Sequence, residues 1–214
     1  MAGLSEATRG VYDRNAEGYH QSRNRDLWER GWLDRVLADV PPGGAVLDLG
    51  CGGGAPIGEY IASRGFDLTG VDFAPAMLRL FARRLPAARA VLADMRALAL
   101  DRHFDAIVGW GSFFHLTAAE QRRALPAIAE HLNPGGRLLL TVGPEAGEAT
   151  GRVEGEAVYH ASLSIAEYRA ILSDADIAVE RFAPNDVESH GHSLLLARRS
   201  AVQGAADAER PDRR

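Results

Sequence analysis

The stretch from Val46 to Gly54 reads Val-Leu-Asp-Leu-Gly-Cys-Gly-Gly-Gly, and Asp72 ends the apolar run that follows it. A short apolar segment therefore leads into a glycine-dense turn, after which Pro56 opens a helical pattern. Glycine is needed where the backbone takes positive φ or where a ligand lies against the main chain. An acid about 20 residues further on is typical of a carboxylate that binds both hydroxyls of a ribose. The order of strand, glycine turn, helix, strand and acid predicts a nucleoside-binding half-fold.

The composition narrows the classes of protein that this chain can belong to. Its 214 residues are 46% hydrophobic, which suits one α/β domain with a complete core. The net charge of −5 gives no reason to expect a nucleic acid or an anionic membrane as a partner. Lysine is absent, so enzymes that require a Schiff-base or P-loop lysine are excluded. Cys51 is the only cysteine, which excludes disulfides and cysteine-based zinc or iron–sulfur sites within one chain.

The sequence also bears on where the protein acts. Its first residues lack the charged and apolar regions of a signal peptide, and no apolar run reaches the length of a membrane span. We therefore expect a soluble cytoplasmic protein, either a monomer or a homodimer.

Apolar runs that suit buried parallel strands alternate with helical patterns in the middle of the chain. Strands are expected at residues 45–49, 68–71, 90–93, 104–109 and 137–142. Helices are expected at residues 56–64, 75–85 and 117–132. This alternation predicts a doubly wound parallel sheet with ligands at the carboxyl ends of its strands.

The remaining segments follow other patterns. Residues 1–40 are expected to be a helical region that ends before the core domain, residues 41–199. Residues 143–157 are rich in glycine and glutamate without periodicity, so a mobile loop is expected there. Two final strands, 177–182 and 193–197, are close enough for an antiparallel hairpin. The tail of residues 200–214 is predicted to be disordered.

Three motifs occur at the ends of successive predicted strands: Asp48-Leu49-Gly50-Cys51-Gly52-Gly53-Gly54, Gly70-Val71-Asp72 and Ala93-Asp94-Met95. With them the chain resembles the class I S-adenosylmethionine-dependent methyltransferases, particularly small bacterial members that act on small molecules. The resemblance covers residues 12–199. It implies a Rossmann-like methyltransferase fold, with one domain and a mostly parallel seven-stranded sheet that ends in an antiparallel hairpin. It also implies S-adenosyl-L-methionine as the cofactor.

The resemblance assigns donor-binding roles to particular residues. Asp48 would help to hold the donor's amino group, and Asp72 would accept both ribose hydroxyls. Asp94 would accept from the adenine amino group while Met95 meets the ring. Residues 1–40 would form a lid in which Arg23 could bind the donor carboxylate. Further donor contacts are expected from Tyr19, Gly50, Cys51, Gly52, Phe73, Met77 and Trp110.

The segment Trp110-Gly111-Ser112-Phe113-Phe114-His115 follows the fourth predicted strand, and in related enzymes it borders the methyl group and the acceptor. His115 is the candidate general base, because an imidazole can remove a proton from a hydroxyl near neutral pH. The His190-x-His192 pair has no convincing third ligand, so we expect no metal site. Acceptor binding is expected to involve Tyr12, Phe113, His115, Tyr159, His160 and His192.

Several functions stay open at this point. The first is methyl transfer to a small-molecule acceptor, at an oxygen, nitrogen or carbon atom. A nicotinamide-dependent dehydrogenase is the alternative, because Gly50 to Ala55 also fits a loose dinucleotide-binding pattern. A peptide or RNA methyltransferase is a third possibility, although the acidic charge disfavours a nucleic acid. The glutamates of residues 143–157 (Glu145, Glu148, Glu154 and Glu156) fit a solvated loop first and also hint at a cationic acceptor.

Overall fold

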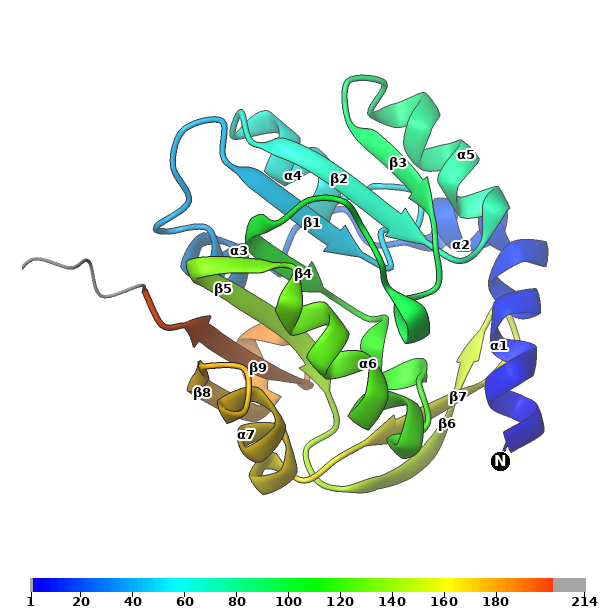
Figure 1. The fold of residues 1–214 in the computed structure, drawn as a ribbon. Helices are drawn as coiled ribbons and strands as arrows, with labels where there is room; N and C mark the ends of the chain where they lie inside the picture. The colour runs from blue at the N-terminus through cyan, green and yellow to red at the C-terminus, as the bar shows by residue number, and fades with distance from the viewer. Residues whose placement is uncertain (1, 202–214) are drawn as a thin grey trace, which may run out of the picture.

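The computed structural model describes residues 2–201 and confirms a mostly parallel seven-stranded sheet flanked by helices (Figure 1). Most of the expected tail, from residue 202 onward, lies outside the described residues. The strand order is β3-β2-β1-β4-β5-β9-β8. Strands β1 to β5 run parallel, and β9 is antiparallel to both of its neighbours. The strands are β1 (Ala45–Leu49), β2 (Asp67–Asp72), β3 (Arg89–Leu92), β4 (Phe104–Gly109), β5 (Leu132–Val142), β8 (Ile177–Asp186) and β9 (His192–Arg199).

Helices cover both faces of this sheet, and the alternation of side chains along each strand explains why. Val46 on β1 belongs to a buried cluster with side chains of α3, α4 and α5, whereas the adjacent Leu47 belongs to one with side chains of α6 and α7. Both residues are fully buried, as expected for a strand in the middle of a parallel sheet. The helices are α3 (Arg30–Val36), α4 (Ile57–Ser63), α5 (Pro75–Arg84), α6 (Ala118–Glu130) and α7 (Ile165–Ser173).

Local signals explain how α6 and α7 begin. Thr117 and Ser164 each accept from the backbone N–H three residues on, and Glu120 and Glu167 bond back to the N-cap backbone. These are two complete capping boxes. The end of α6 differs from the expectation, because the helix stops at Glu130 and β5 already begins at Leu132. A shift of register between β4 and β5 accommodates the Pro-Gly-Gly sequence within the strand.

The expectation of an irregular loop at residues 143–157 is wrong, since a separate antiparallel hairpin occupies most of it. Its strands are β6 (Gly147–Val153) and β7 (Glu156–Ser162). Glu154 and Gly155 form the two-residue turn, and both have positive φ, as such turns require. The residues of β6 are mostly exposed, so they have no apolar alternation from which a strand could be predicted.

Of the N-terminal helices α1 (Ala2–Arg14) and α2 (Ala16–Ser22), α1 lies beside β7 of this hairpin, and both pack against α5 (Figure 1). Val11 of α1 packs against Val153 and Val158. Glu156 accepts from Arg14 and Asn15, and Glu154 accepts from Ser22. These helices and the hairpin therefore form one cover beyond the carboxyl ends of the parallel strands.

Candidate active site

The glycine turn after β1 is fastened to the end of β2. Gly50 and Cys51 both donate their backbone N–H to the Val71 carbonyl, at 2.7 and 3.0 Å. Gly52 donates to Asp72 Oδ2 at 2.9 Å, and Asp72 Oδ1 accepts from Ala74 N at the same distance. Asp72 thus fixes the glycine turn and the start of α5 together, which places its carboxylate on the wall of a cavity.

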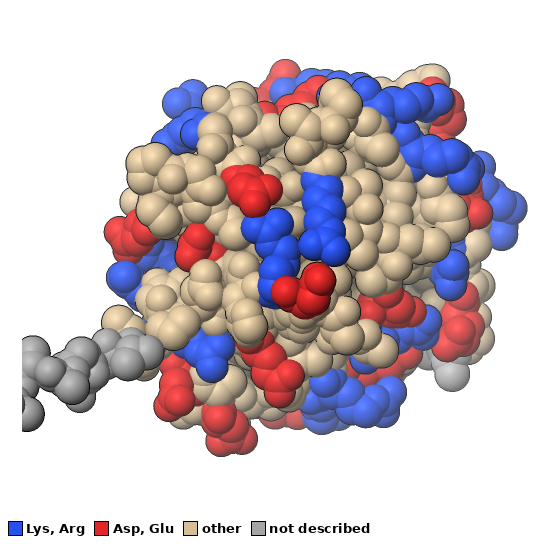
Figure 2. All heavy atoms as spheres, turned by 45° about the horizontal axis from the view of Figure 1, so that its top comes forward, with Lys and Arg blue, Asp and Glu red and all other residues tan. Residues whose placement is uncertain are grey.

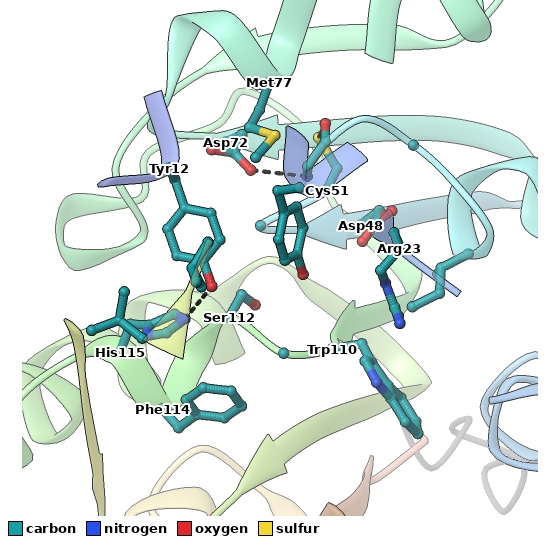
Figure 3. A pocket seen from close by; sticks show the side chains of 18 of the residues that line it. Tyr12, Arg23, Asp48, Cys51, Asp72, Met77, Trp110, Ser112, Phe114 and His115 are labelled. Carbon is teal, nitrogen blue, oxygen red and sulfur yellow. Dashed lines mark hydrogen bonds between the residues drawn. The ribbon is translucent and has the colours of Figure 1, made fainter. Parts of the chain in front are cut away.

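This donor cavity, of about 270 Å³, lies between the glycine turn, the N-terminal helices and the loop after β4. Figure 3 shows Asp72 and Cys51 on one side of it and Phe114 and Trp110 on the other. Most residues that the sequence assigned to the donor line it: Tyr19, Arg23, Asp48, Gly50, Cys51, Gly52, Asp72, Phe73, Met77 and Trp110. Met77 is also part of a buried cluster with Ala74 and Leu80, as its helical pattern predicts.

Two buried carboxyl groups dominate the electrostatics of the donor cavity. Burial, reinforced by the Asp72 carboxylate, raises the pKa of Asp48 to about 7. Burial also raises the pKa of Asp72 to about 6, although N–H groups of Ala74, Gly52 and Phe73 oppose the rise. Carboxylates whose charge is poorly solvated are well suited to bind a cation. The site therefore favours a ligand with positive charge and hydroxyl groups.

Arg23, at the end of α2, extends toward Asp48 in Figure 3, and it is already paired with a buried acid. Its guanidinium bonds to Glu29 Oε1, while Glu29 Oε2 is buried and has no hydrogen-bond partner among the described residues. The Arg23 guanidinium also lies 5.6 Å from the centre of the Trp28 ring, which itself meets Trp110 edge-on. Arg23 is thus held at the cavity with its charge largely balanced by Glu29.

The predicted adenine residues lie in a smaller adjoining cavity of about 110 Å³, which shares Phe73, Ser112 and His115 with the first. Both Asp94 oxygens are occupied by Arg96, whose Nε lies 3.0 and 2.9 Å from them. This pairing lowers the pKa of Asp94 against the effect of burial. An adenine amino group would therefore meet a carboxylate that is already bound, and its recognition by Asp94 stays a prediction.

His115 lies at the junction of these two cavities. Its Nδ1 is 2.8 Å from the Tyr159 carbonyl oxygen, and its Nε2 is 2.9 Å from the Tyr12 hydroxyl. Burial lowers the pKa of His115 to about 4, so the ring is neutral at physiological pH. The lone pair on Nε2 of His115 faces the Tyr12 hydroxyl rather than open space, so the structure does not show His115 acting as a base.

A further cavity of about 450 Å³ opens beyond Phe114, which belongs to the walls of both this cavity and the donor cavity. His160 and His192 are shared in the same way, and burial lowers the pKa of each. The far wall contains Glu145 and Glu148, and Glu148 accepts from the Tyr159 hydroxyl at 2.7 Å. Among residues 2–201, no arginine lines this cavity, which we call the acceptor cavity.

Three expectations about acceptor binding need correction. Phe113 is fully buried in the core, and the neighbouring Phe114 faces both cavities instead. Tyr159 is also fully buried and lines no cavity described above; it contributes its backbone carbonyl to His115. Glu154 and Glu156 hold the N-terminal helices, so they give no hint of a cationic acceptor. The turn of the short 3₁₀ helix at residues 113–115 decides which phenylalanine points outward, and the sequence has no signal for it.

Ser112 is a site residue that the sequence did not single out. Its hydroxyl donates to the Leu49 carbonyl at 2.6 Å, which ties the loop after β4 to the glycine turn. Arg152 and Val158 of the hairpin also line the donor cavity. None of these belongs to a motif, because each reaches the site through long-range packing.

Comparison with known proteins identifies the class. Residues 46–136 match the family model of the methyltransferase domain. A dTDP-3-amino-3,4,6-trideoxy-alpha-D-glucopyranose N,N-dimethyltransferase from Streptomyces venezuelae is 35% identical over 48% of this chain and 44% of its own length. A ubiquinone biosynthesis O-methyltransferase from Xylella fastidiosa is 30% identical over 61% of this chain and 63% of its own. Among solved structures, the S-adenosylmethionine-bound amino pentose methyltransferase CalS10 from Micromonospora echinaspora is 25% identical, with a TM-score of 0.67 over 89% of this chain and 97% of its own.

The chain therefore contains a class I S-adenosylmethionine-dependent methyltransferase domain, which confirms the resemblance in its motifs. It spans about half the length of the first curated relatives that it matches. The dehydrogenase alternative is contradicted, because the matched domain is a methyltransferase and β9 lies antiparallel between β5 and β8. In residues 2–201, no helix is both long and apolar enough to span a membrane.

Proposed function

We propose that this protein transfers the methyl group of S-adenosylmethionine to a small-molecule acceptor. The observation that supports this most is the pair of buried carboxyl groups, Asp48 and Asp72, beside a glycine turn that leaves the main chain open to a ligand. The donor has a ribose with two hydroxyls, an ammonium group and a sulfonium, and this wall suits all three. When bound, it would supply an electrophilic methyl group.

The residues present fit such a donor at both ends. Asp72 would accept the ribose hydroxyls while it keeps its bonds to Gly52 and Ala74, because a carboxylate has about four acceptor positions. Met95 would pack on the adenine in the smaller cavity. Trp110 would place an aromatic wall near the sulfonium, which favours a cation. Arg23 would meet the donor carboxylate.

The acceptor would reach the methyl group from the acceptor cavity, past Phe114 and between His160 and His192. A cavity of this size beside the β6–β7 hairpin suits a small molecule rather than a folded polymer. The face shown in Figure 2 has arginines and acids interspersed, without the continuous basic stripe that phosphate backbones favour. Both observations support a small-molecule acceptor over RNA.

A transfer assay tests this proposal. The purified protein is incubated with methyl-labelled S-adenosylmethionine and a bacterial extract separated into low-molecular-weight, protein and RNA fractions. We expect label in a low-molecular-weight product, and less of it with Asp72→Ala. Label confined to protein or RNA would contradict the assignment of the acceptor. Failure of the protein to bind the donor would contradict the whole function.

A further inference from the structure

The acceptor cavity has two ends that differ in their chemistry. At the inner end, Phe114, His160 and His192 line the donor cavity as well. At the far wall the charged side chains are two glutamates, Glu145 in the loop between β5 and β6 and Glu148 on β6. A ligand that reaches the donor from this cavity therefore meets uncharged rings at one end and carboxylates at the other.

The histidines of the inner end present lone pairs rather than positive charge. His192 Nδ1 lies 2.9 Å from the Ser189 carbonyl oxygen, and because a carbonyl only accepts, Nδ1 must donate. Burial lowers the pKa of His192, so the ring is neutral at physiological pH and Nε2 is left as an acceptor. Burial also lowers the pKa of His160, whose ring packs edge-on against Phe114 at 4.5 Å. The charge in the cavity thus comes from its glutamates.

The carboxylate of Glu148 is held in place by the neighbouring strand. The Tyr159 hydroxyl on β7 donates to Glu148 Oε1 at 2.7 Å. Burial and then this bond raise the pKa of Tyr159, so the hydroxyl keeps its hydrogen and stays a donor. One oxygen of Glu148 is therefore fixed by the protein, and the other is left to accept from a ligand.

The loop that contains Glu145 is fastened to the same strand. Gly143 donates its N–H to Ser162 Oγ at 3.0 Å. The two segments lie so close together that a methyl group on Gly143 would be 2.7 Å from Ser162 Cβ. This contact fixes the path of residues 143–146, so Glu145 and Glu148 are both anchored through β7.

The arginines of the adjoining donor cavity are directed elsewhere. Arg23 is paired with Glu29, and Arg152 donates to the Gly155 carbonyl oxygen at 2.7 Å. A phosphate group in the acceptor cavity would therefore lie beside two carboxylates, and like charges that are brought together at a binding site oppose binding. A cation would be attracted by the same two groups.

We propose that the acceptor is a cationic small molecule without a phosphate group, and that its protonated amine binds Glu145 and Glu148 while its nucleophilic atom lies at the inner end. This inference rests on the proposed function. The Streptomyces venezuelae relative is named for a dTDP-linked amino sugar, so the two proteins are expected to differ in the acceptor that they recognise.

The chemistry of an ammonium group explains both parts of the proposal. An ammonium group has three N–H donors, which can bond to two carboxylates at once in charge-assisted hydrogen bonds. Its lone pair is bound to a proton, so the amine held by the glutamates cannot attack the methyl carbon. A second atom of the acceptor must do so, from the end of the cavity that lies next to the donor. The acceptor therefore has at least two functional groups.

Sorting acceptors by charge tests this inference without knowledge of the acceptor. The low-molecular-weight fraction of a bacterial extract is divided near neutral pH into molecules that bind a cation exchanger, molecules that bind an anion exchanger and molecules that bind neither. Each pool is incubated with the protein and methyl-labelled S-adenosylmethionine. We expect labelled product from the cationic pool, unchanged after the extract has been treated with phosphatase. Label that arises only from the other pools, or that is lost after phosphatase treatment, would overturn the inference.

Variants of the glutamates provide a second readout. The double variant Glu145→Gln and Glu148→Gln keeps the shape of the wall and removes its charge. The amount of the cationic pool that gives half the maximal rate should rise about tenfold, while the maximal rate changes less than about threefold. Glu130→Gln, at an exposed acid at the end of α6, is the matched control. An unchanged half-saturating amount in the double variant would overturn the inference.

Salt and donor binding separate the remaining explanations. Raising the salt concentration from about 50 to about 500 mM should increase the half-saturating amount for the wild type and much less for the double variant, because salt screens the exposed carboxylates. S-adenosylhomocysteine should bind both proteins equally in calorimetry. If the wild type does not bind S-adenosylhomocysteine, the proposed function itself fails. If it binds but labels none of the low-molecular-weight pools, the small-molecule acceptor is wrong and this inference fails with it.

Discussion

The two halves of the active site are built in different ways. The wall of the donor half that carries Asp72 is made by short segments at the ends of β1 and β2, where Gly52 donates to Asp72 across only 20 residues. The acceptor half joins the loop after β4, the β6–β7 hairpin and the start of β9, which contribute Phe114, His160 and His192. Under the proposed function, donor recognition would depend mainly on local backbone geometry, and acceptor recognition would depend on how distant elements pack. Substitutions in the two halves should therefore differ in their effects on binding and on stability.

The largest effect is expected at Asp72. Asp72→Ala removes the acceptor for the ribose hydroxyls and should weaken S-adenosylhomocysteine binding by about 2–3 kcal/mol in calorimetry. Because burial already raises the pKa of Asp72 to about 6, the free energy of unfolding should change less than the binding energy. Asp101→Asn, at an exposed acid, is the control and should bind like the wild type. Unchanged affinity in Asp72→Ala would break the comparison, since the donor half would then not hold the donor.

Two glycines of the same turn should separate stability from binding. Gly50 has φ +79°, and an added methyl group would lie 2.7 Å from Ser112 Oγ, so Gly50→Ala should lower the free energy of unfolding by roughly 2–4 kcal/mol. Gly52 has φ +51° with open space around an added methyl group, so Gly52→Ala should cost only about 1–2 kcal/mol. That methyl group would narrow the cavity, and donor affinity should fall. Urea unfolding and calorimetry of both variants measure these effects; equal losses of stability would contradict the described packing.

Asp48 should make the stability depend on pH. Its folded pKa of about 7 exceeds the value of about 3.9 in an unfolded chain, so the folded state holds the additional proton between these values. The stabilisation from this proton is complete below about pH 4 and is lost as pH rises through 7. Asp48→Asn, which stays neutral, should therefore gain stability relative to the wild type between about pH 5 and pH 8, by on the order of a few kcal/mol. Urea unfolding of both proteins at about pH 5 and pH 8 measures this. If the difference in free energy of unfolding between Asp48→Asn and the wild type is the same at both pH values, Asp48 is not buried as described.

The smallest effect is expected at Glu156, which joins α1 to the β6–β7 hairpin. Glu156→Ala removes the partner of Arg14 and Asn15 on exposed surface, so the global unfolding midpoint should hardly move. Hydrogen exchange should nevertheless become faster at the end of α1, because local opening requires fewer broken contacts. Glu59→Ala, which removes a comparable partner of Arg84 away from the hairpin, is the control. Identical exchange in α1 for both variants would argue against the hairpin as its anchor. A slowing of exchange in α1 and the hairpin on donor binding stays a prediction of the lid hypothesis.

The sequence predicted the main sheet and the neighbourhood of the glycine turn and Asp72 well because their signals are local. Strands β1 and β4 have the bounds expected from their apolar runs, and the glycine turn and Asp72 lie together as the spacing implied. It failed for β6, whose exposed residues have no alternation, and for the choice between Phe113 and Phe114. It also gave no sign that Arg96 would occupy Asp94 or that Tyr12 would bond to His115. The Tyr12–His115 bond results from packing of distant elements, which no pattern within one segment records, and the Asp94–Arg96 pair depends on the local turn at residues 94–97.

The central claim is that the cavity at the carboxyl ends of β1 and β2 binds the methyl donor. Calorimetry of the wild-type protein with S-adenosylhomocysteine and, separately, with NAD tests it most directly. We predict one donor site per chain, saturable by S-adenosylhomocysteine and abolished or strongly weakened in Asp72→Ala, with no binding of NAD. Binding of NAD in preference to S-adenosylhomocysteine, or donor binding that does not depend on Asp72, would contradict the account.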